Sequence, residues 1–334
     1  MNNLFSFHIQ RYFMTFLIKQ HNYGQNTISS YRDTFRLLLM FIAESRPKLS
    51  ALTIDEISYD LICEFISWLE TTRKNSVSTK NVRLAHMKSF FRYLMMSSPE
   101  YADQCSKVLN VPFGKTEKKP PACLSTEATK ALLAAVDSKT EDGLRHLAIM
   151  SLLYDSGCRV QELIDLNVSD FHSGQCSRIY VHGKGNKYRS IPLLGETEKI
   201  LSKYVKHFKL SADLPLFSNK SGNRLTRQGI RYILSKYTEM ANIKEPDAII
   251  GSVYPHLLRH SKASHLVDGG INIYNVRDFL GHESVVTTQV YLTSNPVVTR
   301  KAIESIAAQT VPESIQHFSA EERDDLMSFL DSLG

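Results

Sequence analysis

The stretch from Tyr254 to Tyr291 constrains the fold more than any other part of this sequence, because it sets the ends of two consecutive helices. Pro255 suits the first position of a helix and the pair Gly269-Gly270 suits its end, which predicts one helix between them. The next segment, IYNVRDFL, repeats apolar residues at helical spacing and ends at Gly281. The sequence therefore predicts two helices in succession, with residue 282 placed directly after the second.

Side chains suited to chemistry are concentrated in this stretch. They are His256, Arg259, His260, His282 and Tyr291, the last on a further short helix that Ser284 can cap. A single histidine or tyrosine on an amphipathic helix is usually a packing or surface residue. A cluster of proton-transfer groups, a phosphate-binding arginine and a nucleophile instead favours a catalytic site.

A zinc site is the competing interpretation, since His256 and His260 have the i, i+4 spacing of a zinc-protease helix. Leu257 occupies the position at which H-E-x-x-H requires its glutamate base. The sequence therefore predicts no metal at this stretch.

The pattern His256-x-x-Arg259, then Leu280-Gly281-His282, then Tyr291 resembles the tyrosine recombinase, or phage integrase, family, and looks like its Xer-like or mobile-element-borne members. Two more segments carry the resemblance. LLYDSGCRVQELIDL, residues 152–166, is similar to the arginine box of the family, and VHGKGNKYRSIPL, residues 181–193, is similar to its lysine-bearing β-hairpin.

The resemblance implies a site of six catalytic residues, which are Arg159, Lys184, His256, Arg259, His282 and Tyr291. Glu162 and His260 are implied as supporting residues, and Lys187 is a rival to Lys184 in the same turn and a candidate DNA contact. From residue chemistry alone, Arg159 could instead simply pair with Glu162. The reaction implied is DNA cleavage and rejoining through a 3′-phosphotyrosine, with no cofactor and no metal.

The charge of the chain suits a polyanionic partner. Residues 1–310 carry 39 Lys and Arg against 28 Asp and Glu, whereas residues 311–334 carry one against six. The five cysteines are scattered without metal-ligand spacing, which is typical of a reduced, cytoplasmic protein. No apolar run reaches the length of a membrane span, so we expect no membrane partner. The basic charge and the resemblance together imply double-stranded DNA as the partner.

The order of the segments predicts a mainly α fold with a small β-sheet, and the resemblance implies an all-helical core-binding (SAM-like) domain followed by a catalytic domain. Residues 1–111 show four amphipathic helical segments and a short fifth one. The resemblance implies that this module binds DNA. Residues 112–122 are rich in proline, glycine and charge, as in a linker, and residues 123–310 would form the catalytic domain. Within residues 1–111 the candidate phosphate contacts are Arg32, Lys80, Arg83 and Lys88. In the catalytic domain, PLFSN at residues 215–219 predicts a further short strand.

Residues 311–334 form an acidic tail, in which Ser319 and Glu322 make a capping box before an apolar stripe. The resemblance implies that this helix docks on a neighbouring protomer in a homo-tetramer holding two DNA sites, and packing on its own domain is the alternative. The predicted activity is site-specific recombination for integration, excision or transposition of a mobile element. Alternatives are chromosome dimer resolution by a Xer-type recombinase, a type IB topoisomerase and a non-catalytic DNA-binding protein.

Overall fold

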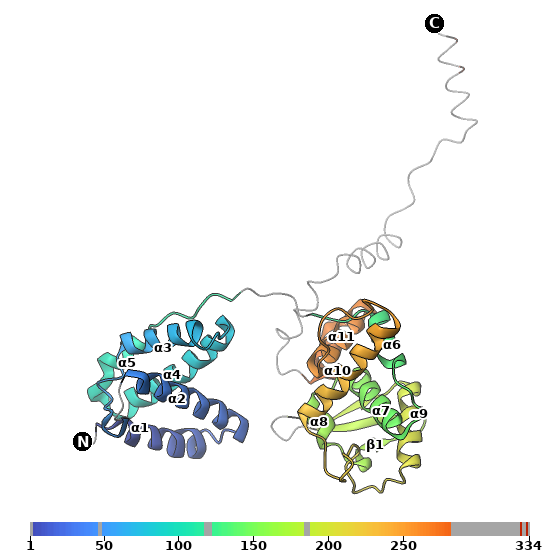
Figure 1. The fold of residues 1–334 in the computed structure, drawn as a ribbon, viewed down its shortest axis with the longest axis horizontal. Coiled ribbons are helices and arrows are strands. Elements are labelled where there is room, and N and C mark those ends of the chain that lie inside the picture. The colour runs from blue at the N-terminus through green and yellow to red at the C-terminus, as the bar shows by residue number, and fades with distance from the viewer. Residues whose placement is uncertain are drawn as a thin grey trace. The chain divides into compact units, whose positions relative to one another are not determined.

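The computed structural model describes residues 3–45, 49–116, 122–183 and 188–281, together with residues 328 and 332. The chain divides into two compact units, Met1–Lys118 and Lys119–Gly334. Each unit has its own hydrophobic core. Figure 1 shows the helices and strands of both units.

Among its described residues, the regular elements of unit 1 are all helices, as the sequence predicts, apart from an isolated bridge between Leu4 and Thr53. Its longer elements are α1 (Phe5–Arg11), the π-helical η1 (Tyr12–Gln20), α2 (Gln25–Ser45), α3 (Tyr59–Thr71), α4 (Val77–Ser97) and α5 (Ala102–Leu109), with short 3-10 turns η2 (Leu49–Ala51) and η3 (Pro99–Tyr101). Ser58 and Ser76 cap α3 and α4 through their hydroxyl groups. The fifth helix confirms the short segment expected after the fourth.

The centre of unit 1 is aromatic. Tyr12 is fully buried, and its ring lies 5.3 Å from that of Phe90 and 6.0 Å from that of Phe35, measured between centroids. Its hydroxyl donates to Ser89 Oγ at 2.8 Å, which satisfies the one polar atom that this burial removes from water. Because α4 carries Phe90 and packs against α2, α3 and α5, it is the central helix of this unit.

Unit 2 contains seven helices among its described residues. They are α6 (Thr126–Ala134), α7 (Glu141–Ser156), α8 (Val160–Asp165), α9 (Gly195–His207), α10 (Arg227–Lys244), α11 (Pro255–Asp268) and α12 (Ile273–Leu280). The predicted ends of α11 and α12 are confirmed. Figure 1 shows α7 in the middle of the unit, and it packs against α9 and α11.

A three-stranded antiparallel sheet, in the order β1-β2-β3, completes unit 2. Its strands are β1 (Phe171–His172), β2 (Arg178–His182) and β3 (Tyr188–Pro192), joined by a 3-10 turn η4 (Val168–Asp170) to α8. The β2–β3 hairpin was predicted and is confirmed; β1 was not predicted. Ile179, Val181 and Ile191 are fully buried and hold the sheet on the helical core.

The predicted strand at residues 215–219 is wrong. This segment makes only isolated bridges, from Pro215 to Asn167 and from Ser218 to Arg224. Its fully buried Leu216 and Phe217 explain the apolar pattern, and the proline lacks the N–H that a longer ladder would use. Among the described residues, no helix is long and apolar enough to cross a membrane.

Candidate functional site

Arg159 lies where α7 gives way to α8. Gly157, with φ of +55°, ends α7 in a left-handed conformation, and Arg159 is the N-cap of α8 in an extended one. The backbone N–H of Arg159 donates to Glu162 Oε2 and its Nη1 donates to Glu162 Oε1, both at 2.8 Å. The pairing that residue chemistry alone suggested is therefore present, yet the Arg159 side chain remains 40% exposed.

Arg259 lies beneath this turn on α11 and is only 1% exposed. Its Nη1 donates to the Gly157 carbonyl and its Nη2 to the Leu280 carbonyl, each at 2.7 Å. Burial, together with the nearby charge of Arg159, lowers the pKa of the Arg259 guanidinium to about 10, so it remains charged at neutral pH.

The C-terminal end of α12 is held by three arginines. Arg189 Nε donates to the Phe279 carbonyl at 3.3 Å, Arg259 to the Leu280 carbonyl at 2.7 Å, and Arg159 Nη2 to the Gly281 carbonyl at 3.1 Å. The last carbonyls of a helix lack partners within it and carry partial negative charge, which suits cations. Three arginines from β3, α11 and the α7–α8 turn thus meet at the residues just before His282.

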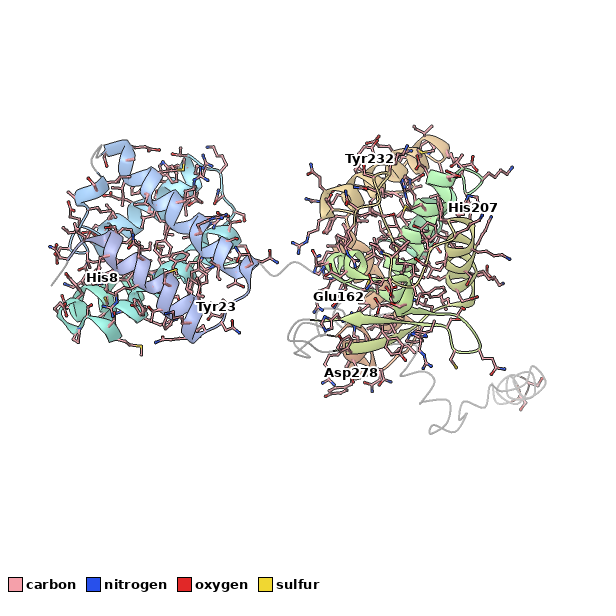
Figure 2. All side chains as sticks on the ribbon, turned by 90° about the horizontal axis from the view of Figure 1, so that it is seen from below. His8, Tyr23, Glu162, His207, Tyr232 and Asp278 are labelled. Carbon is pink, nitrogen blue, oxygen red and sulfur yellow. The ribbon has the colours of Figure 1, made fainter. Side chains whose placement is uncertain are left out.

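Glu162 is the carboxylate of this cluster and is 5% exposed (labelled in Figure 2). Arg189 Nη1 and Nη2 donate to its two oxygens at 2.9 and 2.8 Å, in addition to the bonds from Arg159. Burial alone would raise the pKa of Glu162, but these hydrogen bonds and charges outweigh it and lower the pKa to about 2. Glu162 is thus an anion across the physiological pH range.

Arg189 was missed by sequence reasoning, although a signal for it exists. On β3 it lies two residues before the buried Ile191, so the two side chains are on the same, inward face of the sheet. A charged residue on the inward face of a strand needs a buried partner, which here is Glu162.

His256 and His260 lie one turn apart on α11, with ring centroids 4.5 Å apart and planes at 74°. Partial loss of water lowers the pKa of both rings. The charges of Arg259 and then Arg159 add to the effect on the pKa of His256, and His256 and Arg259 bring the pKa of His260 to about 4. Both imidazoles are therefore favoured in the neutral form, in which one nitrogen can accept a proton.

A pocket of about 250 Å³ opens beside these groups. Arg159 and His256 line it, and so does Arg227, which sequence reasoning also missed. Arg227 Nε donates to Gln161 Oε1 at 2.9 Å, which directs this third basic side chain to the same pocket. Its position at the start of α10 gives no local signal, because only the fold brings it close to Arg159.

Other predicted site residues lie outside the described residues. They are Lys184, Lys187, His282 and Tyr291. The structure describes only the residues next to them: His182 and Tyr188 on the hairpin strands, and Gly281 at the end of α12. Within the described ranges, no group of three or more His, Cys, Asp and Glu side chains is arranged to hold a metal ion.

Two of the candidate DNA contacts in unit 1 differ in accessibility. Arg32 on α2 is 65% exposed and pairs with the adjacent Asp33 at 2.9 Å. Lys88 on α4 is buried, with its ammonium 4.5 Å from the centroid of the Phe113 ring. Arg32 is the better placed of the two to meet a phosphate.

The other two candidates, Lys80 and Arg83, lie one turn apart on α4. Lys80 pairs with Glu70. Arg83 Nη1 donates to the Ser30 carbonyl at 3.2 Å and to Thr34 Oγ1 at 2.9 Å. Lys80 and Arg83 thus already have hydrogen-bond or ion-pair partners within the unit, and a DNA phosphate would have to compete with these partners.

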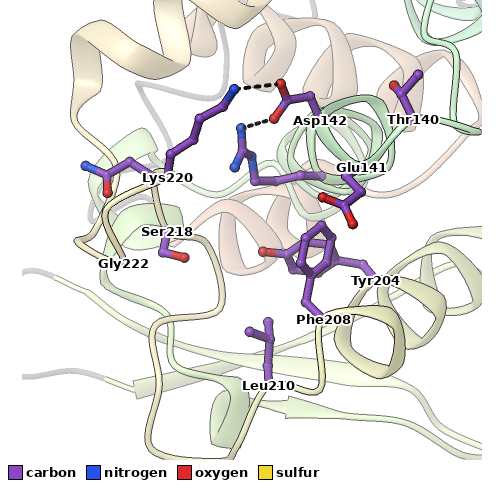
Figure 3. A pocket seen from close by; sticks show the side chains of 11 residues that line it. Thr140, Glu141, Asp142, Tyr204, Phe208, Leu210, Ser218, Lys220 and Gly222 are labelled. Carbon is purple, nitrogen blue, oxygen red and sulfur yellow. Dashed lines mark hydrogen bonds and ion pairs between the residues drawn. The ribbon is translucent and has the colours of Figure 1, made fainter.

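A larger cavity of about 650 Å³ lies elsewhere in unit 2, between α7 and the loops around Phe208 and Lys220 (Figure 3). Its basic residues, Arg145 and Lys220, both pair with Asp142, at 2.8 and 3.3 Å. Their charges are thus partly compensated within the protein, and we assign no function to this cavity.

Comparison with known proteins relates both units to one family. Residues 122–297 match the phage integrase family, and residues 9–97 match the phage integrase N-terminal SAM-like domain. A putative integrase/recombinase of Sinorhizobium fredii is 34% identical over 97% of this chain and 97% of its own length. Tyrosine recombinase XerD of Listeria innocua is 30% identical over 84% of this chain and 91% of its own.

Solved structures share the fold. The Tn1549 transposon integrase, in complex with transposon right end DNA, has a TM-score of 0.69 at 17% identity and covers 92% of this chain and 100% of its own. XerH recombinase bound to its difH substrate has a TM-score of 0.65 at 22% identity, over 84% and 80% of the two chains. Because the family matches cover both units and the Sinorhizobium fredii relative aligns over 97% of both chains, the chain belongs to the phage integrase family. It is a tyrosine recombinase, an enzyme that breaks and rejoins DNA strands.

Proposed function

We propose that this chain is a site-specific DNA recombinase whose phosphate-binding centre is built on Arg159 and Arg259. The observation that carries the proposal is their convergence: one guanidinium from the α7–α8 turn and one from α11 donate to adjacent carbonyls at the end of α12. Arg159 also lines the 250 Å³ pocket with His256. Guanidiniums fixed in this way can hold the non-bridging oxygens of a phosphodiester. Each terminal nitrogen carries two N–H groups, of which the carbonyls and Glu162 take one.

The proposed reaction is a transesterification without cofactor. The phenolic oxygen of Tyr291 attacks phosphorus, a 3′-phosphotyrosine bond forms, and the bond from phosphorus to the 5′-oxygen breaks. His256, favoured as the neutral base, receives the tyrosine proton, and Lys184 supplies a proton to the departing 5′-oxygen. Lys187 is the second candidate for that donor.

The remaining groups stabilise the charge that develops on the phosphate. His282 donates a further hydrogen bond to it, and each preorganised donor of this kind contributes roughly 3 kcal/mol to lowering the barrier. Glu162 fixes Arg159, and His260 packs against the ring of His256. In the proposed reaction Lys184, His282 and Tyr291 act on the same phosphate as Arg159 and Arg259.

The test uses a nicked duplex from which the cleaved strand end diffuses away, so that covalent protein–DNA complex accumulates. We expect the wild type to form it and Tyr291→Phe to form none while keeping its affinity for the duplex. Tyr274→Phe is the matched control, since Tyr274 is an exposed tyrosine on α12. An adduct formed by the Tyr291→Phe variant would remove Tyr291 as nucleophile, and absence of the adduct in the wild type would refute the proposed activity.

We further propose that the biological reaction is integration, excision or transposition of a mobile element. The full-length similarity to a putative integrase/recombinase supports this, whereas the similarity to XerD keeps chromosome dimer resolution as the alternative. Sequencing the DNA recovered covalently on the protein decides between them. Mobile-element ends support the proposal, and a single chromosomal site supports dimer resolution.

We propose the same partners as the sequence indicates: double-stranded DNA held by both units, and a homo-tetramer on two DNA sites. Arg32 is the most exposed of the candidate contacts in unit 1. In the tetramer the acidic tail would dock its apolar stripe, Leu326, Phe329, Leu330 and Leu333, on a neighbouring protomer.

A further inference from the structure

Arg189 occupies a central place in the arginine cluster. Its side chain is 16% exposed and makes three hydrogen bonds, two to Glu162 and one to the Phe279 carbonyl. It also packs against Gly281: a Cβ built on that glycine would lie 2.9 to 3.1 Å from Arg189 atoms. The guanidinium therefore joins β3, α8 and the end of α12 in one contact.

Because two arginines share Glu162, the hold of this carboxylate on Arg159 depends on Arg189, and so does the availability of the Arg159 guanidinium to a phosphate. Arg189 binds both carboxylate oxygens, whereas the Arg159 side chain bonds one of them, Oε1, and sends Nη2 to the Gly281 carbonyl. If Arg189 were absent, Arg159 would be the remaining arginine on a buried carboxylate and would be drawn more strongly to it. Its charge would then be less available to a phosphate in the adjoining pocket.

We propose that Arg189 is a positioning residue for DNA cleavage: by satisfying Glu162 and the end of α12, it keeps Arg159 directed at the phosphate pocket. The inference rests on the proposed function. An arginine is needed because a planar fork reaches both carboxylate oxygens and the Phe279 carbonyl at once, and a lysine ammonium cannot span all three.

The experiment compares Arg189→Gln and Arg189→Lys with the wild type by single-turnover cleavage of the nicked duplex at saturating protein. Loss of a residue that orients a site residue lowers rates by about 10- to 100-fold. We expect a fall of about 100-fold for Arg189→Gln and about 10-fold for Arg189→Lys. Affinity for the duplex should change less than about threefold, because it is the sum of many phosphate contacts and the phosphate at the cleavage site is only one of them.

The matched control is Arg178→Gln. Arg178 is an exposed arginine on the neighbouring strand β2, and it contacts the ring of Tyr180. The change removes the same charge from the same sheet, so an effect of net charge on DNA binding would appear in both variants. We expect the cleavage rate of this control to stay within about twofold of the wild type.

A double variant separates positioning from general stability. If Arg189 acts by restraining Glu162, then Arg189→Gln combined with Glu162→Gln should cleave no more slowly than Arg189→Gln alone, because the carboxylate that captures Arg159 is gone. A further drop equal to that of the single Glu162→Gln change would show that the two residues act independently and would overturn the inference.

The remaining outcomes are also decisive. Cleavage by Arg189→Gln within about threefold of the wild type removes the positioning role while leaving the proposed function intact. Loss of the folded state in both Arg189 variants, seen by circular dichroism, makes the residue a structural one and overturns the inference as well. Failure of the wild type to form an adduct refutes the proposed function instead, and the inference with it.

Discussion

Arg259 illustrates how a single guanidinium can be both buried and fixed. It bridges the Gly157 and Leu280 carbonyls, the first at the end of α7 and the second at the end of α12. Both bonds are 2.7 Å long, and the side chain is almost fully buried. A charge in this position is stabilised by main-chain dipoles, with Glu162 contributing at longer range.

We predict that Arg259→Lys lowers the free energy of unfolding of unit 2 by about 1–3 kcal/mol, because one ammonium leaves one buried carbonyl unpaired. Urea unfolding should be followed with two probes. Circular dichroism reports on both units, whereas fluorescence reports on unit 1, since Trp68 is the only tryptophan. The expected result is an earlier dichroism transition and an unchanged fluorescence transition; equal shifts in both would contradict the assignment.

His86 in unit 1 predicts a pH dependence of stability. Its Nδ1 lies 2.8 Å from Thr34 Oγ1, and burial, then the charge of Arg83, lowers the pKa of the imidazole to about 4. The unfolded chain binds a proton near pH 6.5, so stability is complete above that pH and is lost as the pH falls from 6.5 toward 4.

The measurement is the urea midpoint of Trp68 fluorescence between pH 7 and pH 5. We expect the midpoint of the wild type to fall with pH and that of His86→Gln to fall less. The matched control is His146→Gln: His146 has a pKa lowered to about 4 by its burial, but it belongs to unit 2. A fluorescence slope that responds to His146 rather than His86 would contradict the prediction.

At the scale of elements, the parts of the site that sequence reasoning could predict are those with local signals. The ends of α11 and α12 follow from Pro255 and Gly281, which act on their own helices. The strand pattern marks Arg189 as inward-facing, but its partners could not be assigned because they are 27 and 90 residues away. Strand β1 could not be assigned because β2 supplies its pairing. The sequence therefore predicts the helices that carry the site better than the contacts that hold them together.

Among the residues that end the helices of the site, we expect Gly281 at the end of α12 to be the most sensitive to substitution. Its φ of +66° ends α12 in the left-handed region, and its missing Cβ leaves room for Arg189. Gly281→Ala should cost about 1–2 kcal/mol in backbone strain and should also displace Arg189. We predict a loss of DNA cleavage beyond the loss of stability.

Gly270→Ala is the control for this prediction. Gly270 has a φ of +83° at the end of α11, but an added Cβ would meet nothing within 4 Å. The control should lose a similar amount of stability, measured by urea unfolding, and keep its cleavage rate. If both variants cleaved equally well, close packing of Arg189 on Gly281 would have no catalytic consequence.

At the scale of the whole molecule, charge separates the tail from the rest of the chain. Residues 1–310 have a net charge of +11 and residues 311–334 have one of −5. An acidic segment with one apolar stripe is suited to a protein surface and is repelled by DNA. The proposed tetramer also needs a way to delay cleavage until two DNA sites are paired, and we propose that docking of the tail on a neighbouring protomer provides it.

Truncation after Pro312 tests this coupling. We predict that the truncated protein binds a single DNA site as the full chain does, forms the paired-site complex more weakly, and cleaves with altered yield. Burial of each large apolar side chain contributes about 1.5–3 kcal/mol, so loss of the stripe should weaken formation of the paired-site complex enough to be measured. Gel mobility separates single-site from paired-site complexes, and a full-length Phe329→Ser variant distinguishes loss of the stripe from loss of charge. If the truncated protein assembles and recombines two sites as well as the full chain, the tail packs on its own domain or is dispensable, and the synchronising mechanism must lie within residues 1–312.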